Sequence, residues 1–230
     1  MHLFTGSSAA AADMSCRGMG CLSSGKKGHP LRQGFSRETM VENIKDQGVD
    51  GYYPGNVLKF CPRCSSAKFI FQGGKSFSCG ECGFRFFINA AAAVAALIED
   101  SQGRLLLVRR AREPLKGTLD LPGGFVDTGE SAENALCREV LEELNLRIDR
   151  FTYFCSFPNT YLYAGIVYFT LDLAYVCTVK DMDPIGTADD VDGYVFLRPE
   201  EVRVEDIGHA SIREIVSRFL ALRLKGRECP

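Results

Sequence analysis

Three glutamates on one predicted helix are the residues of this chain best placed to do chemistry. Glu139, Glu142 and Glu143 stand at positions i, i+3 and i+4, so on a helix their carboxylates share one face. Like charges at this spacing repel each other, and the helix dipole disfavours anions in a last turn. Bound divalent cations remove this penalty, because hard cations such as Mg²⁺ and Mn²⁺ take oxygen ligands. The pattern therefore predicts a divalent-cation site, and the competing interpretation is a solvated acidic helix face.

The flanking residues predict the helix and the loop that position these carboxylates. Ser131 is a suitable N-cap, and apolar residues recur at helical spacing behind it: Ala132, Ala135, Leu136, Val140 and Leu144. Glu130 lies in the glycine-bounded loop before the helix. We expect its carboxylate to fold back onto the guanidinium of Arg138 and to fix the loop against the helix. Asn145 is suited to the left-handed conformation that ends many helices.

The spacing of these residues resembles the signature of the Nudix hydrolases. Five residues separate Gly124 from Glu130 and seven separate Glu130 from Arg138; the matching positions are Gly124, Glu130, Arg138, Glu139, Val140, Glu142, Glu143 and Leu146. Asn145 departs from the glycine usual in the family. The resemblance implies an α/β fold, namely the Nudix α/β/α sandwich with a mixed sheet. It also implies metal-dependent pyrophosphate cleavage. The catalytic residues that it implies are Glu130, Arg138, Glu139, Glu142 and Glu143, and the metal ligands are the last three glutamates and the Gly123 carbonyl.

Composition and charge exclude several classes of protein. The 230 residues carry a formal net charge of −2, so no polyanion-binding role for the whole chain is implied. No apolar run is long enough to span a bilayer, and we expect no membrane partner. The six cysteines outside the two pairs described next show no disulfide framework. We therefore expect a reducing, cytoplasmic location, with organelle targeting by the N-terminal segment left open.

Two cysteine pairs predict a second metal site. Cys61 and Cys64 form one CxxC pair, Cys79 and Cys82 form another, and fourteen residues lie between the pairs. Four thiolates at this spacing suit structural Zn²⁺ in closed tetrahedral geometry. The residues between the pairs predict a β-hairpin, so residues 56–88 are expected to form a zinc ribbon that depends on its metal for folding. Because this segment carries few basic residues, nucleic acid is not expected as a general partner.

The rest of the chain divides into a tail and a larger domain. Residues 1–50 are expected to form a disordered or flexible tail. Residues 1–33 are rich in Ala, Ser and Gly without apolar periodicity, and a targeting peptide or an extension from an upstream start remain open; residues 36–47 could form a short amphipathic helix. Residues 89–226 alternate strands and helices. Strands are expected within residues 90–99, 104–110, 119–121, 151–156, 166–177 and 193–197. Residues 210–224 have the periodicity of an amphipathic closing helix.

A CxxC…CxxC ribbon before a Nudix domain resembles the NADH pyrophosphatase branch of the family. That branch cleaves NADH or NAD, including NAD-capped RNA, and commonly pairs into homodimers through the ribbon side. Its marker, Ser-Gln-Pro-Trp-Pro-Phe-Pro, is matched in residues 156–162 only at Ser156 and Pro158, with Tyr161 in place of Phe. Phe157, Tyr161 and Tyr163 could stack on a nucleobase or line the core. Arg109, Arg110 and Lys116 could meet phosphates or remain solvated.

The residues and the resemblance together predict a metal-dependent hydrolase of a nucleoside diphosphate linked to another group. An NAD(H)-like dinucleotide is the first candidate substrate, and ADP-ribose or another nucleotide sugar is the second. Glu142 is the first candidate for the general base; Asp189, Asp190 and Asp192 are alternatives. The candidate from another class is a catalytically inactive nucleotide sensor or nucleic-acid-binding module with the same fold.

Overall fold

A computed structural model describes residues 50–183, 185–187 and 191–225. Of the expected tail, residues 1–50, only Asp50 is described. Asp189 and Asp190, two of the alternative bases, also lie outside the described residues. The elements are η1 (Asp50–Tyr52), α2 (Pro54–Val57), β1 (Phe69–Gln72), β2 (Ser76–Cys79), β3 (Arg85–Phe87), β4 (Ala91–Ile98), β5 (Leu105–Arg110), β6 (Leu119–Asp120), β7 (Gly123–Phe125), α3 (Ala132–Leu144), β8 (Ile148–Tyr163), β9 (Ile166–Val179), β10 (Val191–Leu197), η2 (Val204–Asp206) and α4 (Ala210–Lys225).

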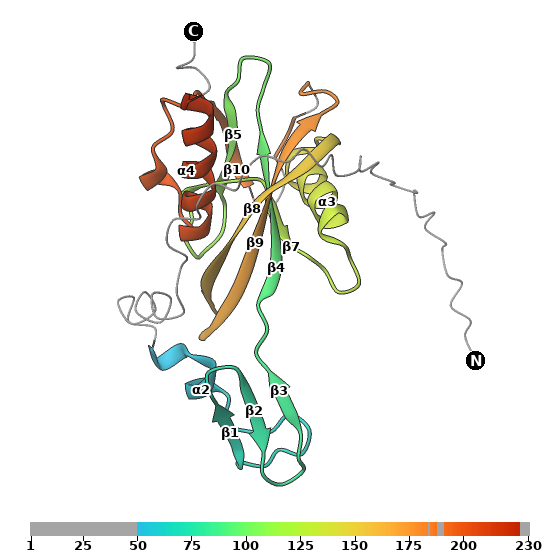
Figure 1. The fold of residues 1–230 in the computed structure, drawn as a ribbon, viewed down its shortest axis with the longest axis vertical. Helices are drawn as coiled ribbons and strands as arrows, with labels where there is room; N and C mark the ends of the chain where they lie inside the picture. Colours follow the sequence, from blue (N-terminus) through green and yellow to red (C-terminus); the bar gives the residue numbers. More distant parts are fainter. Residues whose placement is uncertain (1–49, 184, 188–190, 226–230) are drawn as a thin grey trace, which may run out of the picture.

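Strand β4 is apolar along its length because both of its faces are buried. Val94, Ala96 and Ile98 pack into a core against α3, whereas Ala95 and Leu97 pack into a second core against α4. Strand β5 alternates in the same way between the two cores. A strand buried on both faces loses the polar alternation of a surface strand. The sheets are thus sandwiched between α3 and α4, which lie on opposite sides of them in Figure 1.

The strands form a mixed arrangement. One sheet has the order β7-β4-β9-β8, in which β4 and β9 run parallel and the other pairs are antiparallel; a second sheet has the order β10-β5-β6. This confirms the predicted α/β fold with a mixed sheet. Among the described helices, none is long and apolar enough to cross a membrane.

The hairpin of β8 and β9 is longer than the sequence predicts. We expect β8 to end near Ser156, but it continues to Tyr163, and the two strands pair from Ile148↔Val179 out to Tyr163↔Ile166. Strand β4 supports β9 only from Thr170 to Cys177, so the end of the hairpin extends beyond its neighbour. The aromatic residues of this end therefore lie on a two-stranded ribbon, which a local pattern interrupted by Pro158 does not reveal.

Helix α3 begins and ends where its capping residues predict. The Ser131 hydroxyl accepts a hydrogen bond from the Asn134 N–H at 3.2 Å, which satisfies one of the free donors of the first turn. Asn145 adopts φ 55°, ψ 26° and ends the helix in the left-handed region. Because both ends are fixed, the glutamates of the last turns have a defined direction relative to the preceding loop.

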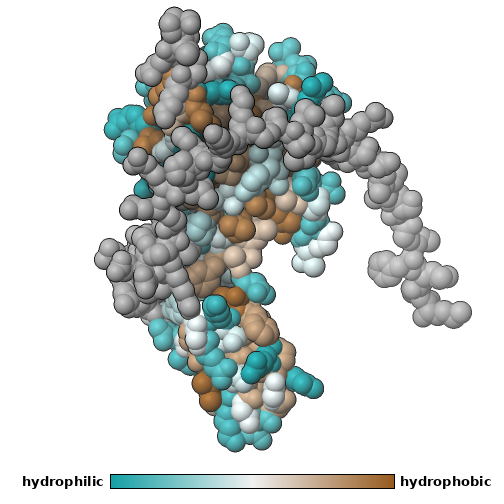
Figure 2. All heavy atoms as spheres, in the orientation of Figure 1, coloured by the Kyte–Doolittle hydropathy of each residue, from teal (hydrophilic) through white to brown (hydrophobic). Residues whose placement is uncertain are grey.

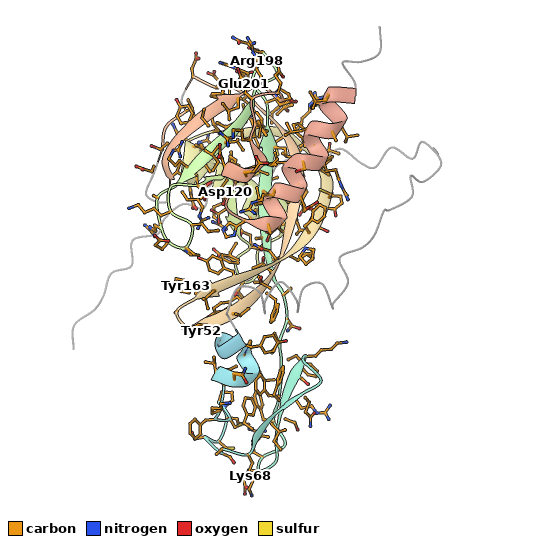
Figure 3. All side chains as sticks on the ribbon, turned by 90° about the vertical axis from the view of Figure 1, so that its left-hand side faces the viewer. Tyr52, Lys68, Asp120, Tyr163, Arg198 and Glu201 are labelled. Atoms are coloured by element: carbon orange, nitrogen blue, oxygen red, sulfur yellow. The ribbon has the colours of Figure 1, made fainter. Side chains whose placement is uncertain are left out.

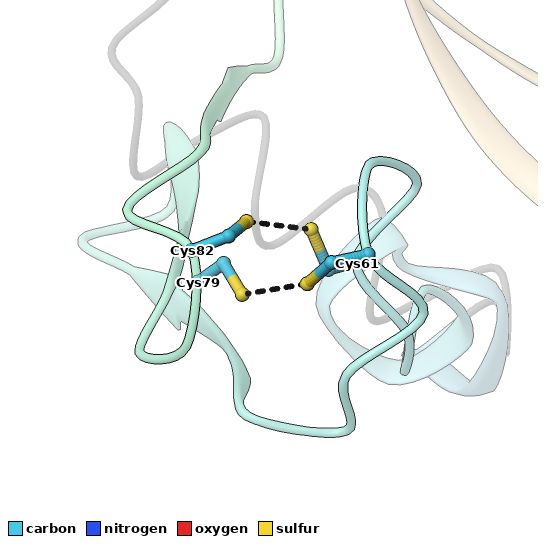
Figure 4. A group of neighbouring side chains, drawn as sticks. Cys61, Cys79 and Cys82 are labelled. Atoms are coloured by element: carbon cyan, nitrogen blue, oxygen red, sulfur yellow. Dashed lines mark hydrogen bonds between the residues drawn. The ribbon is translucent and has the colours of Figure 1, made fainter.

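The four cysteines come together in a small separate unit formed by β1, β2 and β3. Figure 4 shows the Sγ–Sγ pairs, which are 3.7 Å apart for Cys61 and Cys82 and 3.6 Å apart for Cys64 and Cys79. A tetrahedral site with Zn–S bonds of about 2.3 Å has sulfurs about 3.8 Å apart. The geometry therefore fits a zinc ribbon, and the unit's own core is limited to Phe69, Phe77 and a few partly buried neighbours.

The surface of this unit carries several apolar side chains among hydrophilic ones, as Figure 2 shows. The exposed members are Phe60, Ile70, Phe86 and Phe87. On the side facing the larger domain, the Tyr53 ring makes edge contacts with Phe71 at 5.7 Å and with Phe169 of β9 at 5.8 Å. Tyr53 thus joins the cysteine unit to the extended part of the hairpin.

Replacing one ligand tests the zinc assignment. We expect Cys79→Ser to lower the zinc content from about one ion per chain, because three thiolates no longer close the tetrahedron. Metal analysis after dialysis measures the loss. The matched control is Cys155→Ala, which removes a buried cysteine of the larger domain. Equal zinc in the two variants would refute the site.

Candidate active site

The guanidinium of Arg138 organises the acidic site. Its Nε and one terminal nitrogen donate to the two oxygens of Glu130 at 3.0 and 2.9 Å. The other terminal nitrogen donates to Glu139 at 2.8 Å and to Glu142 at 3.1 Å. A further bond of 3.0 Å reaches the Phe125 carbonyl at the end of β7. One side chain therefore joins the loop, the helix and the edge strand, as the sequence predicts for Glu130.

The three helix carboxylates have different surroundings. The Glu139 side chain is only 16% exposed, whereas Glu142 is 60% exposed. Burial raises the pKa of Glu139, although the bond from Arg138 acts in the opposite direction. Glu143 accepts a 2.9 Å hydrogen bond from the Gly123 N–H. The sequence predicts the shared face but not these separate environments, which depend on the neighbouring strand.

Two glycines allow β7 to approach these carboxylates. A Cβ at Gly124 would lie 2.5 Å from the carboxyl carbon of Glu139, and a Cβ at Gly123 would lie 2.0 Å from the Val94 carbonyl oxygen. Gly123 also has φ +147°, where side chains are strained. A larger residue at Gly124 would therefore push β7 away from α3 or move the Glu139 carboxylate, and one at Gly123 would push β7 away from β4.

A cavity of about 440 Å³ opens beside this cluster. Glu139, Glu143 and Asp127 line its acidic side, and the aromatic rings of Phe125, Tyr161 and Tyr163 line another part. Tyr161 contacts Phe125 edge-on at 6.4 Å and stacks on Tyr163 at 6.0 Å. In Figure 3, Tyr163 lies on the long hairpin, between Asp120 and the segment that carries Tyr52.

The three predicted substrate-binding residues, Arg110, Phe157 and Tyr161, lie in different surroundings. Tyr161 lines the cavity. Arg110 also lines it, but its guanidinium donates to Asp120 at 3.0 Å and to the Pro114 carbonyl at 3.1 Å. Phe157 does not appear among the residues that line this cavity; it packs against the core on the α4 side, with the Arg218 guanidinium 4.9 Å from its ring centre. Asp192, an alternative base, is exposed on β10.

Two residues near the cavity were not singled out from sequence: Asp120, which lines it, and His209, which does not. Asp120 is buried, pairs with Arg110 and lies 4.0 Å from Nε2 of His209. Burial raises the pKa of Asp120 and lowers the pKa of His209. A signal for Asp120 was available, since a carboxylate between Leu119 and Leu121 in a strand needs a buried partner. His209 lies before α4, far away in the chain, and carries no local signal.

The donor set fits divalent cations with oxygen ligands. Four carboxylates lie within 4 Å of the Arg138 guanidinium, those of Asp127, Glu130, Glu139 and Glu142. The fifth carboxylate of the cluster, Glu143, is bonded to the Gly123 N–H instead. The resulting excess of negative charge would repel an anionic substrate unless cations were bound. Among the described residues, only the four cysteines bring three or more potential ligand atoms within 4.8 Å of one another. The oxygens of Glu139 and Glu142 are instead bonded to Arg138, and Glu143 is bonded to the Gly123 N–H.

The Glu130–Arg138 pair should make stability depend on pH. The Arg138 guanidinium holds the pKa of Glu130 below its usual range. A lowered folded-state pKa stabilises the fold above the unfolded pKa, near pH 4.3, and this contribution is lost as the pH falls through the folded pKa. We expect Glu130→Gln to cost about 1–2 kcal/mol at pH 7 and to reduce this acid dependence.

Urea unfolding at pH 7 and at pH 3 measures both effects. Glu214→Gln on α4 is the control, because this exposed residue has no ion pair in the described part of the chain. If both variants lost the same stability at pH 7, the loop would not depend on the Glu130–Arg138 bond.

Comparisons with known proteins agree with this architecture. The family model of the NUDIX domain matches residues 89–219. A crystal structure of a NUDIX hydrolase from Nitrosomonas europaea superposes with a TM-score of 0.56 at 22% identity, covering 74% of this chain and 94% of that one. At this identity the likeness supports the fold alone.

Two curated relatives are similar over shorter parts. An ADP-ribose pyrophosphatase from Methanocaldococcus jannaschii is 43% identical over 63 residues, 27% of this chain and 37% of the relative. A NAD-capped RNA hydrolase NudC from Klebsiella pneumoniae is 28% identical over 159 residues, 69% of this chain and 61% of the relative. The chain thus spans less than two thirds of either relative. Since the family match covers more than half of its 230 residues, the chain belongs to the Nudix family.

Proposed function

We propose that the protein is a metal-dependent hydrolase that cleaves the pyrophosphate of a nucleoside diphosphate linked to a second group. The supporting observation is a single cavity with Glu139 and Glu143 on one side and the rings of Tyr161 and Tyr163 on another. Carboxylates that hold cations suit the pyrophosphate, and aromatic faces suit a nucleobase. An NAD(H)-like dinucleotide, free or as an RNA cap, is the first candidate substrate.

Each charged residue has a distinct task in this proposal. Glu139, Glu142, Glu143 and the Gly123 carbonyl would hold the cations, Mg²⁺ or Mn²⁺. When bound, such cations neutralise phosphate charge and lower the pKa of a coordinated water. Glu130 and Arg138 hold the loop against α3, so that Glu139 and Glu143 face the cavity, whereas Glu142 does not line it. Glu142 is the exposed one of the three helix carboxylates, and it would take the proton of an attacking water.

ADP-ribose is the second candidate substrate. The relative named ADP-ribose pyrophosphatase is 43% identical over its 63 matched residues, whereas the relatives named NAD-capped RNA hydrolase match longer segments at lower identity. The chain also departs from the dinucleotide marker at most positions of residues 156–162. An inactive sensor is the candidate from another class, and the full set of acidic residues argues against it.

A substrate panel separates these candidates. NADH, NAD, ADP-ribose, ADP-glucose, diadenosine polyphosphates and nucleoside triphosphates are incubated with Mg²⁺ or Mn²⁺, and phosphate is measured after phosphatase treatment. We expect the highest kcat/KM for NADH or NAD, and no turnover with EDTA. A clear preference for ADP-ribose would replace the first candidate. No turnover of any compound would favour the sensor.

Glu142→Gln should fold normally but lose activity by about 100-fold or more, because the amide cannot accept the proton. Steady-state kinetics and thermal unfolding give the two readouts. Glu133→Gln is the matched control, since it makes the same change in the first turn of α3. Near-normal turnover of Glu142→Gln would move the general base to another residue.

A further inference from the structure

A smaller pocket of about 140 Å³ lies beside the catalytic cavity. The two share the Gly123–Gly124 backbone, Arg110, Asp120 and Tyr161. Asn159, Asp172 and His209 line the smaller pocket and do not line the larger one. Its volume is well below the roughly 300–1,000 Å³ that hold a drug-sized ligand, so it suits one ring of a larger molecule. We call it the inner pocket.

The charged residues that line the inner pocket disfavour the binding of an anion. Its only lining cation among the described residues is Arg110, whose guanidinium is already bonded to Asp120 and to a carbonyl. The second carboxylate, Asp172, is 6% exposed and accepts hydrogen bonds from the hydroxyls of Thr170 and Ser211. Lining carboxylates therefore outnumber lining cations. A phosphate placed here would meet a charge that no partner neutralises.

Other polar groups of the inner pocket have hydrogen-bonding capacity left. Within the described residues, the side chains of Asn159, Tyr161 and His209 make no hydrogen bond, although Tyr161 and His209 are in ring contact at 5.9 Å. Burial lowers the pKa of His209, so its neutral ring offers one donor and one acceptor. The Asn159 amide offers both as well. Half-buried polar groups of this kind favour a ligand that completes their bonds.

We propose that the inner pocket binds one uncharged ring of the substrate, a heterocycle or sugar that carries both donors and acceptors, and that it excludes a phosphorylated ring. Asn159 and His209 would select the ring through hydrogen bonds, and Asp172 would repel a phosphate. The inference rests on the proposed function, because the adjoining acidic cavity must hold the pyrophosphate. It adds a determinant of specificity outside the acidic segment of residues 123–146.

Two matched substrate pairs test the exclusion of phosphate. NADH and NADPH differ by a phosphate on the adenosine ribose, and ADP-ribose and ADP-ribose 1″-phosphate differ by one on the terminal ribose. We expect kcat/KM to fall at least about tenfold with the added phosphate in one of the pairs, according to which ring enters the pocket. Asp172→Asn should reduce that discrimination by about tenfold. Its amide matches the carboxylate in shape, and the hydroxyls of Thr170 and Ser211 can rotate to suit it.

The neutral contacts are tested with the unphosphorylated substrate. His209→Ala and Asn159→Ala should each raise KM about tenfold and change kcat little, since the lost bonds lie away from the reacting phosphorus. Asp149→Asn, an exposed change of the same charge on β8, is the control and should alter neither discrimination nor KM.

The outcomes separate this inference from the proposed function. If the parent enzyme hydrolyses a dinucleotide or ADP-ribose but shows no phosphate discrimination, or if Asp172→Asn leaves the discrimination unchanged, the inner pocket is not the selecting site. If the parent hydrolyses nothing, the proposed function fails, and calorimetric binding of ADP-ribose still tests the pocket. Weaker binding by His209→Ala would then support the inference, and equal or absent binding would overturn it.

Discussion

The candidate site depends on one guanidinium that is shared by four acidic side chains and a backbone carbonyl. Arg138 lies in the middle of α3, and it reaches Glu130 in the preceding loop and Phe125 at the end of β7. Its charge offsets carboxylates that would otherwise repel one another across the helix face. The loop, the helix and the strand consequently share a single electrostatic centre, and each is held in place by the other two.

The packing explains how this centre is kept rigid. Alternate residues of β4 and β5 enter two cores, one under α3 and one under α4, so the central strands are fixed on both faces. Strand β7 pairs with β4 at Gly123–Ala95 and thereby places the Gly123 N–H against Glu143. The geometry of the carboxylates is therefore set by the apolar interior as well as by their own ion pairs.

Sequence patterns over short stretches predicted the features that depend on residues close together in the chain. The caps of α3, the Glu130–Arg138 contact and the convergence of four cysteines follow from short spacings, and the mixed α/β fold follows from the resemblance to the Nudix signature. The structure contains each of them. The inner pocket could not be predicted in this way, because His209, Asp172 and Asn159 meet only after β8, β9 and the α4 segment have packed together. The placement of Phe157 against α4 likewise depends on tertiary packing.

The reach of the β8–β9 hairpin beyond β4 has an energetic consequence for the aromatic wall of the cavity. Two strands without a third neighbour are marginally stable in water, so the end that carries Tyr161 and Tyr163 draws little rigidity from its own hydrogen bonds. Among the described residues, the ring contact that ties it to the cysteine unit is that of Tyr53 with Phe169. The packing of Tyr53 against Phe71 of β1 and Phe169 of β9 therefore connects the cysteine unit to the hairpin whose outer end carries these tyrosines.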